Sequence, residues 1–135
     1  MLIRRLFGWS LVAACAALAL LGADAKPTTL QGVLIDKECS ARAETRMVSG
    51  ANPHLEGGML WAYTHDKKCL LMPACQRSGY GVFTYDGMFL PFDAAGAQKA
   101  LALIQTSKKL DDMRVEVTGE IDGGKIKVAS LKLLP

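Results

Sequence analysis

The chain lacks a strong net charge, and after its first 25 residues it lacks any long apolar run. Its 135 residues hold 16 Lys+Arg against 13 Asp+Glu, which excludes the basic stripe expected of a nucleic-acid binder. The sequence also has no phosphate-binding loop, zinc-protease motif, haem box, Cys-x-x-Cys redox motif or Ser-His-Asp order. We therefore expect neither enzyme activity nor a nucleic-acid partner.

The first 25 residues have the layout of a secretory signal peptide. Two arginines precede the uncharged apolar segment Leu6–Leu21, and Ala23-Asp24-Ala25 supplies small residues before the expected cleavage site. The apolar segment is short for a membrane span, which needs roughly 20 residues. We predict export to the periplasm or the medium, a mature chain of residues 26–135, and no membrane span after cleavage.

A lipoprotein signal is the alternative for the same segment. Val12-Ala13-Ala14-Cys15 resembles a lipoprotein cleavage site, and cleavage there would leave a lipidated Cys15 at the N-terminus. We favour the first interpretation, because apolar residues 16–21 would otherwise follow the lipid anchor. Removing residues 1–25 leaves 14 basic and 12 acidic residues, which fits one small, monomeric globular domain.

Hydrophobic patterning predicts five strands and one long helix in the mature chain. Asp86-Gly87 suits a two-residue type I′ turn between the second and third strands. A slip in apolar phase at Ala129 predicts a β-bulge in the last strand. The expected strands are 30–35, 80–85, 88–92, 113–121 and 125–134, and the expected long helix is 94–106.

Five strands with one helix between the third and fourth is the element order of an OB-fold barrel. We therefore predict a mainly β, five-stranded, OB-fold-like barrel formed by residues 26–135. Between the first two strands, residues 39–79 form a polar, cysteine-containing insertion. We expect this insertion to be irregular, with short helical segments near 41–47, 66–71 and 74–78.

Several of these motifs together resemble a family of small exported bacterial proteins of unknown function. The motifs are Gly32-x-x-x-Asp36-x-x-Cys39, then His65, Cys69 and Cys75, then Gly79-Tyr80, then Val117-x-Gly119. The likeness covers nearly the whole mature chain. It implies an OB-fold-like domain and no specific activity. In this chain the Cys-x5-Cys spacing and the loop after Cys39 are both longer than is typical of that family.

The mature chain has three cysteines, Cys39, Cys69 and Cys75. In an oxidising compartment such residues form disulfides, and three pairings are open, each leaving one thiol over. Linking Cys39 to either of the other two would close a loop of some 30 residues and stabilise the fold by roughly 3–4 kcal/mol. We rank a structural disulfide first.

The alternative is a metal site formed by Cys39, His65, Cys69 and Cys75. Three cysteines and one histidine are a ligand set of structural zinc sites, and thiolates with imidazole also suit copper. If the intervening segment is helical, His65 and Cys69 share one face. Asp36 is then expected to orient His65 by accepting a hydrogen bond from its ring.

The sequence thus favours an exported binding or interaction module in which Cys39, His65, Cys69 and Cys75 are chiefly structural. Its ligand, an unidentified protein or small molecule, would bind on the barrel face or the insertion. A periplasmic zinc- or copper-binding protein is the second hypothesis. An oligonucleotide-binding OB-fold is the third, and the near-neutral charge disfavours it.

Overall fold

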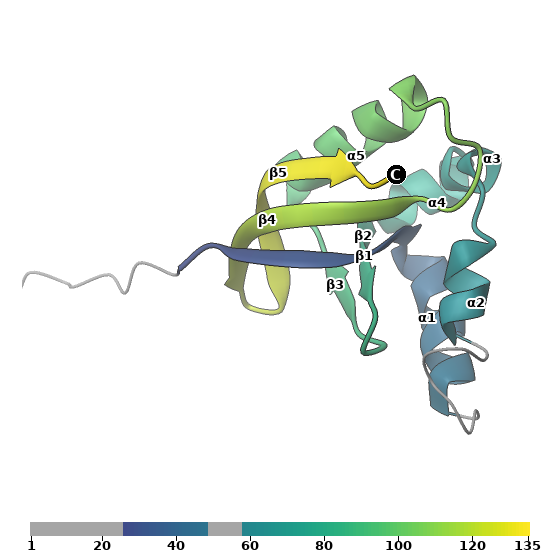
Figure 1. Cartoon of the computed structure of the whole chain (residues 1–135), viewed down its shortest axis with the longest axis horizontal. Helices are drawn as coiled ribbons and strands as arrows, with labels where there is room; N and C mark the ends of the chain where they lie inside the picture. The colour runs from purple at the N-terminus through teal and green to yellow at the C-terminus, as the bar shows by residue number, and fades with distance from the viewer. Residues whose placement is uncertain (1–25, 49–57) are drawn as a thin grey trace, which may run out of the picture.

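The computed structural model describes residues 26–48 and 58–135 (Figure 1). The expected signal peptide, residues 1–25, lies outside the described residues, and so does Cys15. Cleavage and lipidation therefore stay predictions. No helix within the described ranges is long and apolar enough to cross a membrane.

Five strands form one antiparallel sheet, as the sequence predicts. β1 lies at its centre, with β2 and then β3 on one side and β4 and then β5 on the other. Residues 32–36 of β1 are all buried, because both faces of the sheet are covered there. The strands are β1 (Thr28–Asp36), β2 (Tyr80–Thr84), β3 (Phe89–Pro91), β4 (Arg114–Asp122) and β5 (Lys125–Leu133).

The sheet is open and does not close into the predicted barrel. Among the described residues, no ladder joins β3 to β5; one isolated parallel bridge pairs Ile126 of β5 with Phe92, the residue that follows β3. β3 has only three residues and ends at Pro91, which has no N–H to donate. The outer edge of β3 therefore offers too few backbone groups for a closing ladder.

The predicted bulge in the last strand is confirmed. Thr118 pairs with Ser130, whereas the next residue, Gly119, pairs with Val128. Ala129 is therefore the extra residue. This insertion bends β5 and restores the burial of alternate apolar residues after the slip in phase.

The predicted type I′ turn between β2 and β3 is wrong. Gly87 has a φ of 86°, but Asp86 has no positive φ, and a type I′ turn needs both. The Thr84 N–H donates to the Met88 carbonyl at 2.9 Å, so the loop has three residues, 85–87. A three-residue loop with glycine in the left-handed region is the next most common hairpin connection.

The long helix α5 (Ala94–Thr106) lies where the sequence predicts it and covers one face of the sheet (Figure 1). Asp93 caps it, since its Oδ1 accepts from the Gly96 N–H at 2.9 Å. Ala100 and Ile104 face the sheet and are fully buried. They pack in the main core with Leu34, Tyr80, Val82, Met113, Val115, Val117 and Ile126.

The insertion between β1 and β2 is more helical than predicted. It contains α1 (Lys37–Val48), α2 (Gly58–Tyr63), α3 (Lys67–Leu70) and α4 (Pro73–Ser78). These helices gather at one end of the sheet, with α1 and α2 side by side (Figure 1). They enclose a second core formed by Val33, Ile35, Ala43, Met59, Ala62 and Phe83.

Candidate functional site

The three cysteines occupy the same position in three different helices. Cys39, Cys69 and Cys75 are each the third residue of their helix, in α1, α3 and α4 respectively. Asp36 caps α1, since its Oδ1 accepts from the Cys39 N–H at 3.1 Å. Asp66 caps α3 in the same way, at 2.6 Å from the Cys69 N–H. Both aspartates thus place a cysteine one turn after a helix start.

The position of Cys75 in α4 depends on a proline at the start of this helix and on the pairing of β1 with β2. Pro73 occupies the first position of α4, where a missing N–H is tolerated. α4 leads directly into β2, whose first residue, Tyr80, pairs with the last residue of β1, Asp36. The starts of α1 and β2 are therefore adjacent, and this adjacency brings Cys75 close to Cys39.

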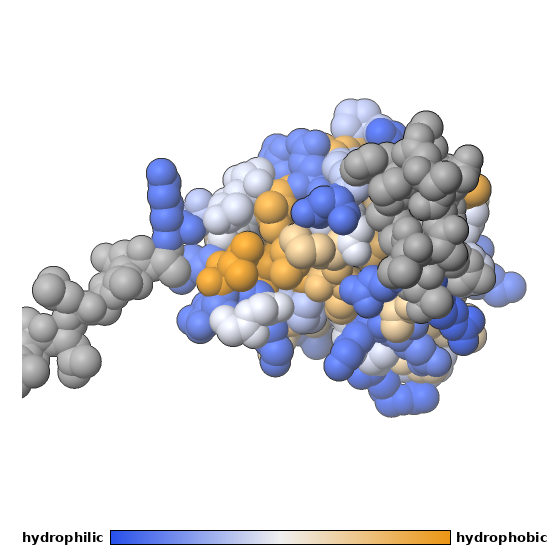
Figure 2. Space-filling view, turned by 90° about the horizontal axis from the view of Figure 1, so that it is seen from below, coloured by the Kyte–Doolittle hydropathy of each residue, from blue (hydrophilic) through white to orange (hydrophobic). Residues whose placement is uncertain are grey.

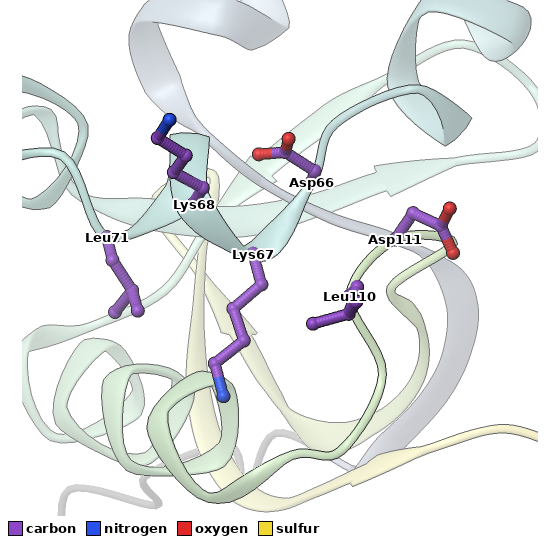
Figure 3. A pocket seen from close by; sticks show the side chains of 6 residues that line it. All are labelled: Asp66, Lys67, Lys68, Leu71, Leu110 and Asp111. Atoms are coloured by element: carbon purple, nitrogen blue, oxygen red, sulfur yellow. The ribbon is translucent and has the colours of Figure 1, made fainter.

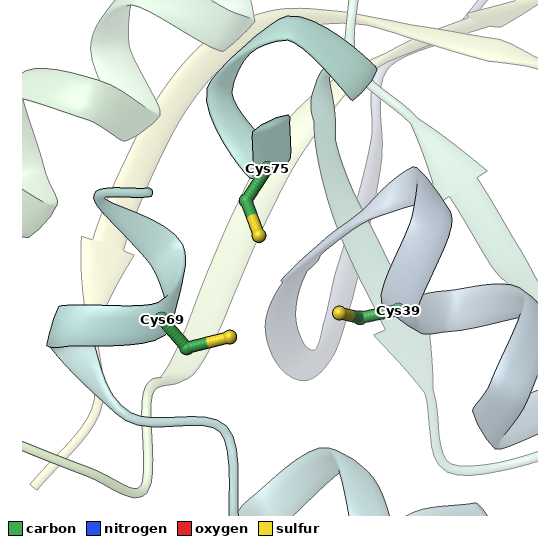
Figure 4. A group of neighbouring side chains, drawn as sticks. All are labelled: Cys39, Cys69 and Cys75. Carbon is green, nitrogen blue, oxygen red and sulfur yellow. The ribbon is translucent and has the colours of Figure 1, made fainter. Parts of the chain in front are cut away.

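The three sulfurs converge in the space between these helices (Figure 4). Every pair of Sγ atoms lies within 4.8 Å, and all three cysteines are free thiols. No pair of the three is at disulfide distance, whereas a disulfide holds its sulfurs about 2.05 Å apart. Cys39 and Cys75 are buried, and Cys69 is partly exposed. The geometry is a cluster of three thiols.

A second triad overlaps the first at Cys39. One ligand atom from each of Asp36, Cys39 and His65 lies within 4.8 Å of the others. The structure thus describes two triads, and not a single group of all four predicted cysteine and histidine ligands. His65 belongs with the carboxylate and the first cysteine.

His65 is buried and has an unused acceptor. Its side chain is only 5% exposed, and Nδ1 lies 3.4 Å from the Trp61 carbonyl. The Trp61 ring packs edge-on against it at 5.6 Å between centroids. With the proton on Nδ1, Nε2 is the acceptor, and no partner for Nε2 exists among the described residues. The group that orients this ring is therefore the Trp61 carbonyl. The sequence predicts Asp36 in this role instead.

Asp36 is fully buried with one oxygen used and one unused. Oδ1 accepts from the Cys39 N–H and lies 3.1 Å from the Ser78 hydroxyl. No N–H or O–H of the described residues donates to Oδ2. The Cys39 and Cys75 thiols hydrogen-bond to this carboxylate, and a cation that took the place of their protons would neutralise part of the buried negative charge.

Burial and negative charge together keep the inner thiols protonated. Desolvation is the main cause that raises the pKa of Cys75 to about 11, and the Asp36 carboxylate adds to it. The same two causes, in the same order, raise the pKa of Cys39 further. Because thiolates are the form that ligates metals, an ion binding here would have to displace these protons.

A small cavity adjoins the outer side of the thiol cluster. Its volume is about 250 Å³, which corresponds to roughly eight waters at about 30 Å³ each. Two of the cysteines and the histidine line it, whereas Cys75 does not. The lining residues are Cys39, Arg42, Trp61, Thr64, His65, Asp66 and Cys69.

Two of the hollows that are larger than this cavity have no thiol or imidazole among their described lining residues. One of about 540 Å³ lies beside α3, between Lys67, Leu71 and Leu110 (Figure 3). There the Lys67 ammonium is bound to the carbonyls at the end of α5. The other, of about 380 Å³, is lined by apolar residues including Met88 and Ile121. Figure 2 shows apolar residues gathered on the face of the molecule away from α5.

Sequence reasoning missed the part that Asp66 and Ser78 play in building the site. The signal for Asp66 was present, because Asp36-x-x-Cys39 recurs as Asp66-x-x-Cys69. In both copies the aspartate caps a helix and so fixes the direction of the cysteine. Ser78 gave no such signal, because its contact with Asp36 depends on the pairing of β1 with β2.

We compared the chain with protein-family models, with curated proteins and with solved structures, and none of the three comparisons gave a match.

Proposed function

We propose that the protein binds one thiophilic metal ion, Zn²⁺ or Cu⁺, through Cys39, Cys69 and Cys75. The observation that carries the proposal is the convergence of three free sulfurs within 4.8 Å of one another. Thiolate ligands select zinc and monovalent copper over hard cations. His65, which is grouped with Cys39 but not with the other two cysteines, would move toward the ion and supply the fourth donor through Nε2, giving a tetrahedral zinc set of three sulfurs and one nitrogen.

The electrostatics of the site support a cation. Within residues 26–48 and 58–135, the buried Asp36 carboxylate has an oxygen without an N–H or O–H donor, and the His65 Nε2 acceptor has no partner. Asp36 and His65 both belong to the triad that shares Cys39 with the sulfur cluster. A bound ion would be attracted by the carboxylate and would use the imidazole. It would also remove the cost of leaving the imidazole acceptor buried and unsatisfied.

A disulfide within the cluster remains the competing proposal. Three thiols this close need only small side-chain movements to bring one pair to about 2.05 Å, and an exported protein would meet oxidants. One disulfide, however, leaves the third thiol and the buried His65 acceptor without a role. The metal proposal uses all four groups.

The wider proposal concerns the fold and the compartment. We propose that the open sheet is an incomplete OB-fold-like barrel, supported by the strand order and the parallel bridge between Phe92 and Ile126. We also propose that the protein is exported, on the strength of the signal-like residues 1–25. Its role is then to bind an ion outside the cytoplasm, with no catalytic step assigned.

The test is the metal content of reduced protein. Chains incubated with Zn²⁺ or Cu⁺ under reductant and desalted are expected to retain one ion each. Cys69→Ser is expected to lose it, and His65→Ala to weaken it. The mature chain offers a matched control in His54→Ala, which is expected to retain the ion. Absence of bound metal, with a two-hydrogen mass gain when protein isolated without reductant is reduced, would instead establish the disulfide.

A further inference from the structure

The ligands of the proposed metal site differ in how far they face the solvent. Cys39, Cys69 and His65 line the 250 Å³ cavity, and Cys75 does not. Cys75 is only 6% exposed, whereas Cys69 is partly exposed. An ion held by the three sulfurs would therefore have one side enclosed by protein and one side directed at the cavity. Closed sites are typical of structural metals, and a side open to other ligands is typical of sites that react.

His65 is the most easily displaced donor on the open side. It is a neutral ligand, whereas the three thiolates are charged. Its ring is oriented by one long contact, 3.4 Å from the Trp61 carbonyl. It lies within 4.8 Å of Cys39 but is not grouped with all three sulfurs. An incoming charged donor would therefore replace the imidazole before it replaced a cysteine.

We infer that the ion is loaded and released through this cavity by ligand exchange, in which a thiolate from outside replaces His65. The inference rests on the proposed metal site and names the chemical class of its exchange partner. The cavity has room for a small thiol or a cysteine side chain, at roughly eight water volumes. The site thus holds the metal ion for transfer to another ligand, and does not serve as a permanent structural centre.

The exchange step is balanced without an oxidant. A bond forms between the ion and the incoming thiolate sulfur, and the bond between the ion and His65 Nε2 breaks. The imidazole leaves with its own lone pair, and the ion keeps its oxidation state. Release then needs the three metal–sulfur bonds to be replaced by outside thiolates one after another, beginning at Cys69, the partly exposed cysteine, and ending at the buried Cys39 and Cys75.

The experiment measures zinc transfer from the loaded protein to a colorimetric chelator at increasing concentrations of glutathione. The expected rate rises with glutathione concentration. Thr64→Phe places a bulky ring in the lining of the cavity and is expected to slow the glutathione-dependent rate by on the order of tenfold; zinc affinity is measured in parallel, so that a slower transfer is separated from a change in binding. Thr106→Phe is the matched control, because both threonines are exposed and each hydroxyl donates at 2.8 Å to a helix carbonyl.

A second variant keeps the test decisive if Thr64→Phe fails to fold. His65→Ala removes the group that must leave, so the glutathione-dependent transfer is expected to be faster than in wild type. A transfer rate that is independent of glutathione, or equal in wild type and Thr64→Phe, would overturn the exchange route. Failure of the wild type to bind zinc at all would instead overturn the proposed function.

Discussion

Replacing Tyr80 with Phe tests how the cysteine-bearing helices are held to the sheet. Tyr80 is 3% exposed, and its hydroxyl donates a 2.6 Å hydrogen bond to the carbonyl of Leu70, the last residue of α3. The substitution keeps the ring and leaves that buried carbonyl without its donor, which costs about 1–3 kcal/mol. For a domain of this size the melting temperature should fall by on the order of 4–12 °C.

The same hydrogen-bonded tyrosine predicts a dependence on pH. Burial is the main cause that raises the pKa of Tyr80 from 10.0 to about 12. The folded chain therefore binds more protons than the unfolded chain between these values, and stability falls as pH rises through them. A shift of this size corresponds to a few kcal/mol, at roughly 1.4 kcal/mol for each pKa unit. The stability gap between wild type and Tyr80→Phe should therefore narrow from pH 10 to pH 12.

Urea unfolding followed by circular dichroism measures both effects. Tyr85→Phe is the comparison variant, because Tyr85 is 37% exposed and its hydroxyl is hydrogen-bonded to Tyr63; water can replace this lost hydrogen bond, so the expected loss of stability is smaller than in Tyr80→Phe. Equal stability of wild type and Tyr80→Phe at neutral pH would refute the hydrogen-bond reasoning. A gap that stays constant through the alkaline range would refute the reasoning about the pKa.

Three further outcomes are expected. Gly96→Ala should destabilise the protein by about 1–3 kcal/mol in urea unfolding, because the alanine Cβ would lie 2.4 Å from Val128 Cγ2. This loss is expected although alanine is the better helix former. An unchanged or higher urea midpoint would contradict the prediction. In reduced, metal-free protein, Cys69 should react first with DTNB, because Cys39 and Cys75 are buried and have raised pKa values. Mass spectrometry maps the labelled cysteines, and equal labelling of all three would contradict this order of reaction. Zn²⁺ at 100 times its Kd should stabilise the reduced protein by about 2.7 kcal/mol, and a melting curve that the metal leaves unchanged would count against the site.

The sheet and its long helix could be predicted because their residues alternate or repeat clearly. In β4 every second residue from Val115 to Gly119 is buried, which is the pattern that the apolar alternation predicts. The bulge at Ala129 followed from a slip in the same alternation. Closure of the barrel could not be predicted in this way, because it depends on how many backbone groups the short strand β3 offers at its outer edge.

The site was predictable in its residue types but not in its geometry. The cysteines could be expected at one end of the sheet, because the insertion starts at the end of β1 and returns at the start of β2. The sequence did not show that capping by Asp36 and Asp66 would place Cys39 and Cys69 at equivalent helical positions. Nor did it show the contact of His65 with the Trp61 carbonyl, which depends on the packing of the insertion.

X-ray absorption at the zinc edge of reduced, Zn²⁺-loaded protein tests the central claim most directly, because it counts the donor atoms around the ion. The account predicts three sulfur scatterers at about 2.3 Å and one nitrogen at about 2.0–2.1 Å. Loss of one sulfur in Cys75→Ser would assign the shell to this cluster. A shell of nitrogen and oxygen alone would contradict the claim that Cys39, Cys69 and Cys75 hold the ion.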